Sequence, residues 1–71
     1  MSIVYRKLRP GEVRPGLRVF YRPYPGAPRE SGVVIRRSAQ TTYIFIQFDR
    51  GVGRTPKAVY EDTLEVQEVE S

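Results

Sequence analysis

The sequence predicts an all-β protein, a small five-stranded, strongly bent antiparallel barrel, and two observations lead to this prediction. Proline and glycine turn signals recur so often between residues 9 and 57 that no stretch long enough for a helix remains. Between the turns lie short runs rich in β-branched and aromatic residues, which are typical of strands. Short strands in a 71-residue chain would expose their edges in a flat sheet, so closure into a barrel is expected.

The N-terminal residues fit two structures. The run Ile3-Val4-Tyr5 is typical either of an edge strand or of a frayed tail. We therefore expect residues 1–13 to form an N-terminal segment, flexible or paired as an edge strand, and residues 14–69 to form the barrel. A chain of this length has room for one small domain.

The first barrel strand is expected over residues 17–22, which lie between turn signals at Pro15-Gly16 and Pro23. Side chains alternate between the two faces of a strand, so one set should face the core and the other the solvent. This alternation turns Leu17, Val19 and Tyr21 inward, and Arg18, Phe20 and Arg22 outward.

The second and third strands are expected over residues 32–37 and 42–49. The connection at residues 38–41 has the length of a hairpin loop, so these strands should pair antiparallel. In the second strand, Val33 and Ile35 are expected inside, while Val34 and Arg36 face outward. In the third strand, the inward side chains are Ile44, Ile46 and Phe48, and the outward ones are Tyr43, Phe45 and Gln47.

The rest of the barrel is expected in residues 49–69. A turn at residues 49–53 leads to a strand over residues 57–60, then to a single tight turn at residues 61–63 that suits a 3₁₀ conformation. The last strand is expected over residues 64–69. The predicted core consists of Val19, Val33, Ile35, Ile44, Ile46, Phe48 and Leu64.

Composition restricts the chemistry that the chain can perform. With no Cys and no His, it cannot form a disulfide or a zinc site of the finger or ribbon kind. The commonest general base and the best thiol nucleophile are also missing. The segment Gly51-Val52-Gly53 has no helix after it, which indicates a hairpin turn and not a phosphate loop. We therefore expect no enzymatic activity, no metal and no cofactor.

Hydropathy and the absence of Cys indicate the compartment. The longest uninterrupted apolar run, Tyr43-Ile44-Phe45-Ile46, is far shorter than the apolar region of about 7–15 residues in a signal peptide. A membrane-spanning helix needs about 20 apolar residues. A chain without Cys does not need an oxidising compartment either. We expect a cytoplasmic protein that does not contact membranes.

The net charge of +4 conceals a strong asymmetry along the chain. Residues 1–57 contain all 12 basic side chains and three acidic ones, which gives +9. Residues 58–71 contain five acidic side chains and no basic one, which gives −5 and restores the total of +4. Such a basic body with an acidic end is typical of proteins with nucleic-acid or acidic-protein partners. Ten of the basic residues are Arg, whose planar guanidinium matches phosphate oxygens and stacks on aromatic rings.

These turns and strands resemble the SH3-like small barrels of the Tudor and KOW type. More narrowly, the chain is similar to short uncharacterised proteins encoded by bacteriophages and prophages. The resemblance covers residues 14–66 and implies the barrel fold, but it brings no established activity. Two departures are Tyr60, where Pro is expected, and Thr63, which is inserted before the closing Leu. The matching residues are Pro15, Gly16, Arg18, Val19, Tyr21, Pro23, Glu30, Gly32, Val33, Val34, Tyr43, Phe45, Phe48, Asp49, Glu61, Asp62 and Leu64.

The best candidate surface combines arginines with aromatic rings on the outward face. Bases stack on aromatic rings while guanidinium groups bind phosphates, so this combination favours single-stranded nucleic acid. The first hypothesis is a small nucleic-acid-binding accessory protein of phage or bacterial origin. Its phosphate contacts would be Arg18, Arg22, Arg36, Arg37 and Arg54, and its stacking residues Tyr43 and Phe45.

Other interpretations of the same residues remain open. The proline-rich segment at residues 23–30 and the outward aromatics also suit a module that binds a host protein. Exposed strand edges also permit a homo-oligomer. The plainest alternative is that the arginines are solvated surface charge and that Phe20 and Phe45 form a small second core.

Overall fold

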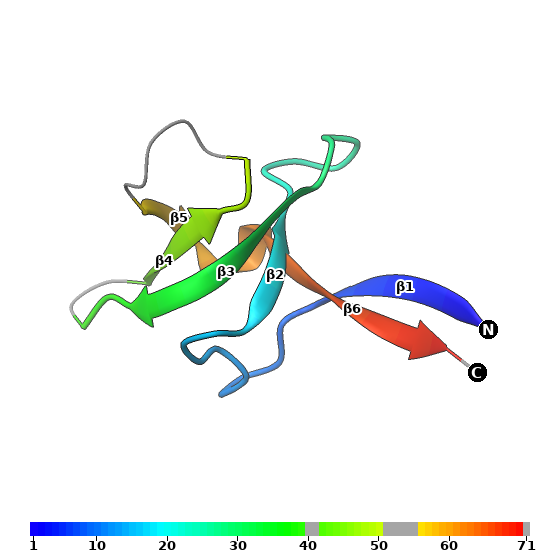
Figure 1. Cartoon of the computed structure of the whole chain (residues 1–71), viewed down its shortest axis with the longest axis horizontal. Helices are drawn as coiled ribbons and strands as arrows, with labels where there is room; N and C mark the ends of the chain where they lie inside the picture. The colour runs from blue at the N-terminus through cyan, green and yellow to red at the C-terminus, as the bar shows by residue number, and fades with distance from the viewer. Residues whose placement is uncertain (40–41, 51–55, 71) are drawn as a thin grey trace.

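The computed structural model describes residues 1–39, 42–50 and 56–70, and these form one antiparallel sheet. Its strand order is β1-β6-β2-β3-β4-β5. The sheet curls into a half-barrel from which the β1–β6 pair extends as a two-stranded arm (Figure 1). This confirms the predicted all-β antiparallel class. The elements are β1 (Ser2–Lys7), β2 (Arg18–Tyr21), β3 (Glu30–Arg37), β4 (Tyr43–Phe48), β5 (Lys57–Tyr60), the 3₁₀ turn η1 (Glu61–Thr63) and β6 (Leu64–Glu70).

The number of strands in the described residues is six rather than the predicted five, because the N-terminal residues form the edge strand β1. β6 contacts β2 only through the pairs Phe20↔Glu65 and Tyr21↔Leu64. The remainder of β6 continues beyond the half-barrel and is paired by β1, from Ser2↔Glu70 to Lys7↔Glu65. The N-terminal segment is therefore held in place by its pairing with the part of β6 that extends beyond the half-barrel.

The strand boundaries follow the predicted turns closely. β5 and η1 have the predicted limits, and β2, β3, β4 and β6 differ from prediction by one or two residues at their ends. The turn η1 is closed by the Thr63 hydroxyl, which donates a hydrogen bond of 2.6 Å to the Tyr60 carbonyl. It is tied to β2 by the Arg22 amide, which donates to the Thr63 carbonyl at 2.8 Å.

The core lies on the concave side of the half-barrel. Its buried side chains are Val19, Val34, Ile44, Ile46, Val59, Leu64 and Val66. The predicted inward faces of β2 and β4 are confirmed. Three of the expected inward residues are only partly buried but pack against this cluster, namely Leu17, Tyr21 and Phe48.

The predicted orientation of β3 is wrong. Val34 is 1% exposed and belongs to the core, whereas Ile35 is 41% exposed and Val33 is half-buried on the outer side. The cause is Gly32, which faces inward opposite β4: a Cβ there would lie 2.7 Å from Ile46 Cγ2. Because strand residues alternate, an inward Gly32 makes Val34 inward as well. A register shift between Val34 and Arg36 then returns Arg36 to the outer face, where it was predicted.

The Glu12 carboxylate holds the connection between β1 and β2 through hydrogen bonds that we call the carboxylate clamp. Arg6 donates two hydrogen bonds to the Glu12 carboxylate, at 2.9 and 2.7 Å, and also pairs with Glu68. The Arg9 amide donates a further bond of 2.9 Å to Glu12. The bonds from Arg6, and then the one from Arg9, lower the pKa of Glu12 from 4.5 to about 2.

This pKa predicts how the stability depends on pH. Because the pKa of Glu12 is lower in the folded chain than in the unfolded chain, its contribution is present above pH 4.5 and disappears as the pH falls toward about 2. Glu12→Gln should therefore be less stable than the wild type at neutral pH and should approach it between pH 4.5 and 2. Urea unfolding as a function of pH measures this difference. Glu70→Gln is the control, and a difference between wild type and Glu12→Gln that does not change with pH would contradict the clamp.

Candidate functional site

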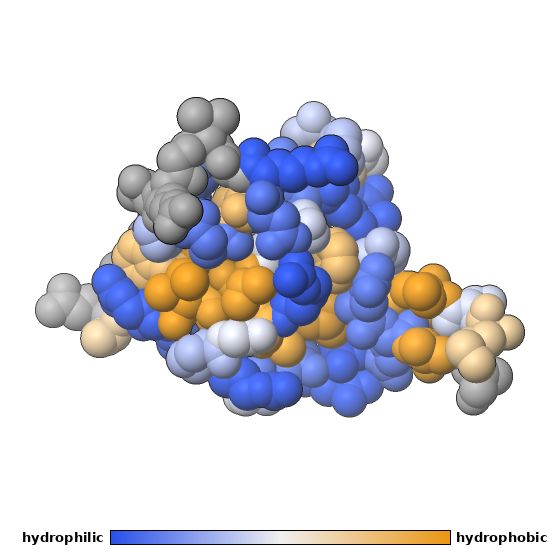
Figure 2. All heavy atoms as spheres, in the orientation of Figure 1, coloured by the Kyte–Doolittle hydropathy of each residue, from blue (hydrophilic) through white to orange (hydrophobic). Residues whose placement is uncertain are grey.

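The outer face of the sheet brings together most of the residues that the sequence pattern placed there. Arg18 on β2 is aligned with Val33 on β3, which is aligned with Gln47 on β4. In the next row, Arg36 is aligned with Phe45 and Phe45 with Ala58 of β5. Tyr43 and Tyr60 form the last row of this face. Figure 2 shows an apolar patch over β3 and β4, bordered by hydrophilic residues.

Arg36 and Phe45 form the strongest feature of the predicted site. The Arg36 guanidinium carbon lies 4.3 Å from the centroid of the Phe45 ring, within the range of a cation–π interaction. In the described part of the chain, Arg36 has no carboxylate partner. This pair therefore offers both a ring and an uncompensated positive charge on the outer face.

Two other predicted arginines are already paired. Arg18 Nη1 lies 2.6 Å from Asp49 Oδ2, which also accepts a hydrogen bond of 2.6 Å from the Ser31 hydroxyl. The hydrogen bond from Ser31, followed by the one from Arg18, lowers the pKa of Asp49. Arg37 pairs with Glu61 and lines a separate cavity together with Tyr60, away from the row of Arg36. Neither arginine offers a free charge to a ligand.

The remaining predicted residues are Arg22, Tyr43 and Arg54. The Arg22 side chain is half-buried at the end of β2, and its Nε is buried with no hydrogen-bond partner in the described residues. The Tyr43 ring centroid lies 4.7 Å from that of Tyr60, and the two hydroxyls are 3.0 Å apart. This hydrogen bond with Tyr43 raises the pKa of Tyr60. Arg54 lies outside the described residues.

The acidic C-terminal segment folds back on the basic body. Glu61 pairs with Arg37, and Glu65 Oε1 lies 2.9 Å from Arg29 Nε. Glu68 pairs with Arg6 and lies 4.0 Å from Arg9 Nη2. Much of the charge asymmetry is thus compensated within the fold. The basic side chains without a carboxylate partner, considering only residues that the structure describes, are Lys7, Arg14, Arg22, Arg36, Arg50 and Lys57.

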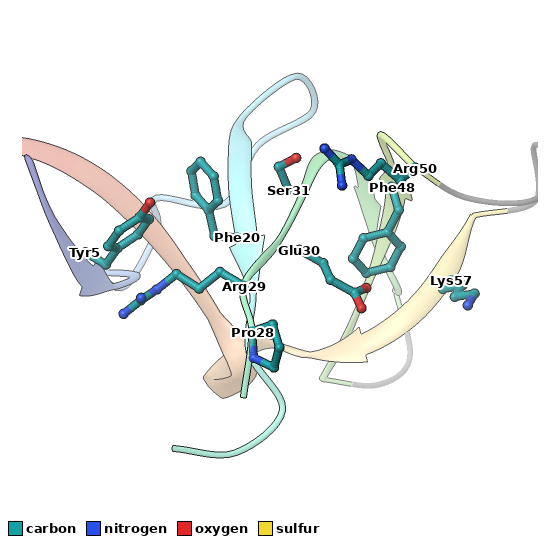
Figure 3. A pocket seen from close by; sticks show the side chains of 9 residues that line it. All are labelled: Tyr5, Phe20, Pro28, Arg29, Glu30, Ser31, Phe48, Arg50 and Lys57. Atoms are coloured by element: carbon teal, nitrogen blue, oxygen red, sulfur yellow. The ribbon is translucent and has the colours of Figure 1, made fainter. Parts of the chain in front are cut away.

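A groove at the N-terminal end of β3 unites two of these free cations with three aromatic rings. Its volume is about 740 Å³. Figure 3 shows Tyr5, Phe20 and Arg29 on one side of β3 and Phe48, Lys57 and the Glu30 carboxylate on the other. We call this surface the β3 groove. Its lining residues are Tyr5, Phe20, Pro28, Arg29, Glu30, Ser31, Phe48, Arg50 and Lys57.

The two sides of the β3 groove differ in their electrostatics. On the first side, the Tyr5 and Phe20 rings meet edge to face at 5.2 Å, and Arg29 lies 3.9 Å above the Tyr5 ring. Glu65 neutralises this Arg29. On the second side, Arg50 and Lys57 are exposed beside Phe48 and the Glu30 carboxylate, and neither cation has an ion pair with a residue that the structure describes. The first side thus offers mainly rings, and the second offers a ring with positive charge.

Sequence reasoning missed the β3 groove although one signal pointed to it. Phe20 was predicted to face outward, and its ring indeed lines the groove. The partners of Phe20 come from β1, from the loop before β3, from the end of β4 and from the start of β5. No spacing in the sequence connects four such segments.

The side chains of the β3 groove can bind planar and charged groups. Its rings can stack on planar groups, Arg50 and Lys57 can bind anions, and the Glu30 carboxylate can accept hydrogen bonds. Among the residues with described positions, no three His, Cys, Asp or Glu side chains gather as a metal site would require. Nor does this part of the chain contain a helix long and apolar enough to span a membrane.

Comparison with protein-family models, with curated proteins and with solved structures finds no match for this chain. The functional assignment therefore rests on the residues of the β3 groove and of the outer face. Phe20 lines the β3 groove and also, together with Arg18, a smaller neighbouring cavity. The β3 groove and the outer face, to which Arg18 belongs, are thus adjacent on the sheet.

Proposed function

We propose that the protein is a small, non-enzymatic module that binds single-stranded nucleic acid along the β3 groove. The observation that carries this proposal is the presence, in one groove, of three aromatic rings and two cations without a carboxylate partner in the described residues. Nucleic acid is the common biological polymer that offers planar bases and phosphates in alternation.

The rings supply the stacking surface. Phe20 and Phe48 are half-buried, so each ring is held by its neighbours while part of it stays open to the groove. Phe48 is supported by Tyr21 at a centroid distance of 5.6 Å, and Phe20 is supported by Tyr5. Stacking of one base on such a ring contributes about 1–3 kcal/mol and depends little on which base it is.

The cations supply the phosphate contacts. Arg50 and Lys57 are exposed on the same side of the groove, so they can bind phosphate without first breaking an ion pair of the described fold. Arg36 on Phe45 extends the surface across β3 and β4. A nucleic-acid strand that leaves the groove over the outer face would cross the row of Arg18, Val33 and Gln47 and then reach this pair.

A module that binds a host protein is the second candidate. The observation that favours it is Tyr24, which is 63% exposed in the proline-rich loop between β2 and β3. Exposed aromatic residues beside prolines are common in protein interfaces. Under this alternative, Tyr24 and not the β3 groove would be the main contact.

We also propose that the fold belongs with the SH3-like small barrels of the Tudor and KOW type. This is supported by the meander from β2 to β5, by the single 3₁₀ turn before β6, and by the return of β6 to pair with β2. The sequence resemblance to bacteriophage and prophage proteins supports an origin in such a genome. Fold alone does not assign an activity, so the nucleic-acid proposal rests on the groove.

Binding to labelled oligonucleotides tests the proposal. We expect binding of single-stranded DNA or RNA that weakens steeply with salt, because each neutralised phosphate contributes a slope of about −0.7 in log K against log salt concentration. Substituting both Arg50→Ala and Lys57→Ala should flatten this slope by about 1.4. Fluorescence anisotropy at several salt concentrations measures it.

The matched control is the pair Arg9→Ala and Arg14→Ala, which removes the same charge from the loop before β2, outside the groove. Its salt slope should stay close to that of the wild type. If both double variants reduce the slope equally, the binding follows net charge and the groove is not its site. Absence of oligonucleotide binding in the wild type, with a specific interaction lost in Tyr24→Ala, would favour the host-protein alternative.

A further inference from the structure

The outer edge of β1 is an unpaired strand edge. β1 is hydrogen-bonded to β6 on one side, and no other described strand lies on its second side. Figure 1 shows this edge on the arm that extends from the half-barrel, with both chain ends at its tip. An open edge presents backbone amides and carbonyls that readily pair with another strand.

The tip of the arm also exposes apolar side chains. Ile3 and Val69 lie directly opposite each other on β1 and β6 and are 61% and 60% exposed. Figure 2 shows an apolar region at the end of the arm, separate from the patch over β3 and β4. Apolar side chains beside an open strand edge are typical of a contact with another chain.

The side-chain pattern of β1 is symmetric. Read in either direction from Val4, the strand has an apolar residue next, Ile3 or Tyr5, and then a polar one, Ser2 or Arg6. Two copies related by a two-fold axis pair each residue with its mirror position. Such a pattern is therefore complementary to itself, and this favours a second copy of the same chain as the occupant.

We propose that the protein forms a dimer in which β1 pairs antiparallel with β1 of a second copy, with the two-fold axis at Val4. In this register Val4 lies opposite Val4 of the second copy, Ile3 opposite its Tyr5, and Ser2 opposite its Arg6. Pairs of aromatic and β-branched side chains are favourable across strands. The exposed Ile3 becomes covered, with Val69 on one side of it and Tyr5 of the second copy on the other.

Other registers are less favourable. An axis at Tyr5 would place Ile3 opposite Lys7 and Val4 opposite Arg6 of the second copy, which mixes apolar with charged side chains. A register shifted by one residue would place opposite each other residues whose side chains point to different faces of the sheet. In the register centred on Val4, Arg6 faces a serine and keeps its own carboxylates, Glu12 and Glu68. No like charges therefore meet across the axis.

The charges of β1 also argue against nucleic acid at this edge. Arg6 is occupied by Glu12 and Glu68, and Lys7 donates to the Asp62 carbonyl at 2.6 Å. The dimer uses neither Arg50 nor Lys57, and the residue that it shares with the β3 groove is Tyr5. It would join two six-stranded sheets into one, with the Tyr5 faces of both copies on the same side.

The molar mass in solution tests the dimer. Light scattering coupled to gel filtration should give a mass that rises with concentration from 8.2 kDa toward twice that value. Ile3→Lys should return the mass to that of a monomer, because it puts a charge opposite Tyr5 of the second copy. Val69→Lys is the matched control: Val69 is equally exposed on the same face but belongs to the inner strand, so the dimer should persist. A wild type that stays monomeric at every concentration would overturn the proposal.

Cysteine cross-linking tests the register, since the chain contains no native Cys. Residues directly opposite in an antiparallel pair have Cα atoms about 4.5–5.5 Å apart, within the span of a disulfide. Val4→Cys should therefore cross-link rapidly upon mild oxidation. In Ile3→Cys the two sulfurs are offset by two residues along the strands, about 6.8 Å, and cross-linking should be much slower. Equal rates for both variants would exclude this register, and capture of another protein instead of a second copy would exclude the dimer.

Discussion

Ile46→Ala should be the most destabilising single truncation, lowering the free energy of unfolding by about 2–5 kcal/mol. Ile46 is fully buried at the centre of β4, where it faces Val34 and Gly32 of β3. Removing its side chain leaves a cavity that the curved sheet cannot easily fill. A chain of this length is expected to have a stability of only about 4–10 kcal/mol, so the variant should lose a large part of it.

Chemical denaturation monitored by tyrosine fluorescence or circular dichroism measures this loss. Ile35→Ala is the matched control, because it removes the same atoms from a side chain that is 41% exposed. Surface substitutions of this kind change stability by no more than about 0.5 kcal/mol. Equal losses in the two variants would mean that β3 has the opposite orientation, with Ile35 in the core.

Gly32→Ala should lower the free energy of unfolding by about 1–3 kcal/mol, because the added methyl group overpacks the contact between β3 and β4. The added Cβ would lie 2.7 Å from Ile46 Cγ2 and 2.8 Å from the Gln47 carbonyl oxygen. The first contact can relax by a movement of a side chain, but the second involves the backbone of the neighbouring strand. The strands must therefore separate, and the stability falls even though the backbone of Gly32 suits alanine.

The two substitutions should also be coupled. In the Ile46→Ala background the Cγ2 atom is gone, so Gly32→Ala should cost less than it does in the wild type. Contacting residues show such coupling energies of about 0.5–3 kcal/mol. A double-mutant cycle measures it. Gly26→Ala provides the uncoupled control: a Cβ at Gly26 meets no atom within 4 Å, so the cost of its positive φ should simply add to that of Ile46→Ala. Strict additivity of Gly32→Ala and Ile46→Ala would show that the two sites do not touch.

The sequence predicted the fold well where its pattern was unambiguous. In β4 the alternation of residues 43–48 identified both faces, and in β2 Val19 and Arg18 were assigned correctly. In β3 the three consecutive β-branched residues, Val33 to Ile35, carry no alternation, so either face was possible. The informative residue was Gly32, since glycine within a strand often marks a close approach of another strand.

The site was only partly predictable for a different reason. Arg36 and Phe45 lie on adjacent strands, and the predicted outward position of Arg36 is correct because the register shift after Val34 offsets the wrong orientation of β3. Whether an arginine is free depends on which carboxylate lies beside it in the folded chain. Glu65 reaches Arg29 across 36 residues, and Glu61 reaches Arg37 across 24. Composition reveals that five acidic residues follow residue 57, but not which arginines they neutralise.

The pairing of Ser2 with Glu70 has a practical consequence for handling the protein. Whatever is attached before Ser2 or after Glu70 emerges at the same corner of the molecule, at the tip of the arm (Figure 1). An affinity tag at either end would crowd the open edge of β1 and could dissociate the proposed dimer. The tag must therefore be cleaved before a monomeric mass is interpreted.

The same proximity of the two ends makes the chain suitable for circular permutation. A short glycine linker between the two ends, with new ends at the exposed loop around Tyr24, would leave every strand pair of the sheet in place.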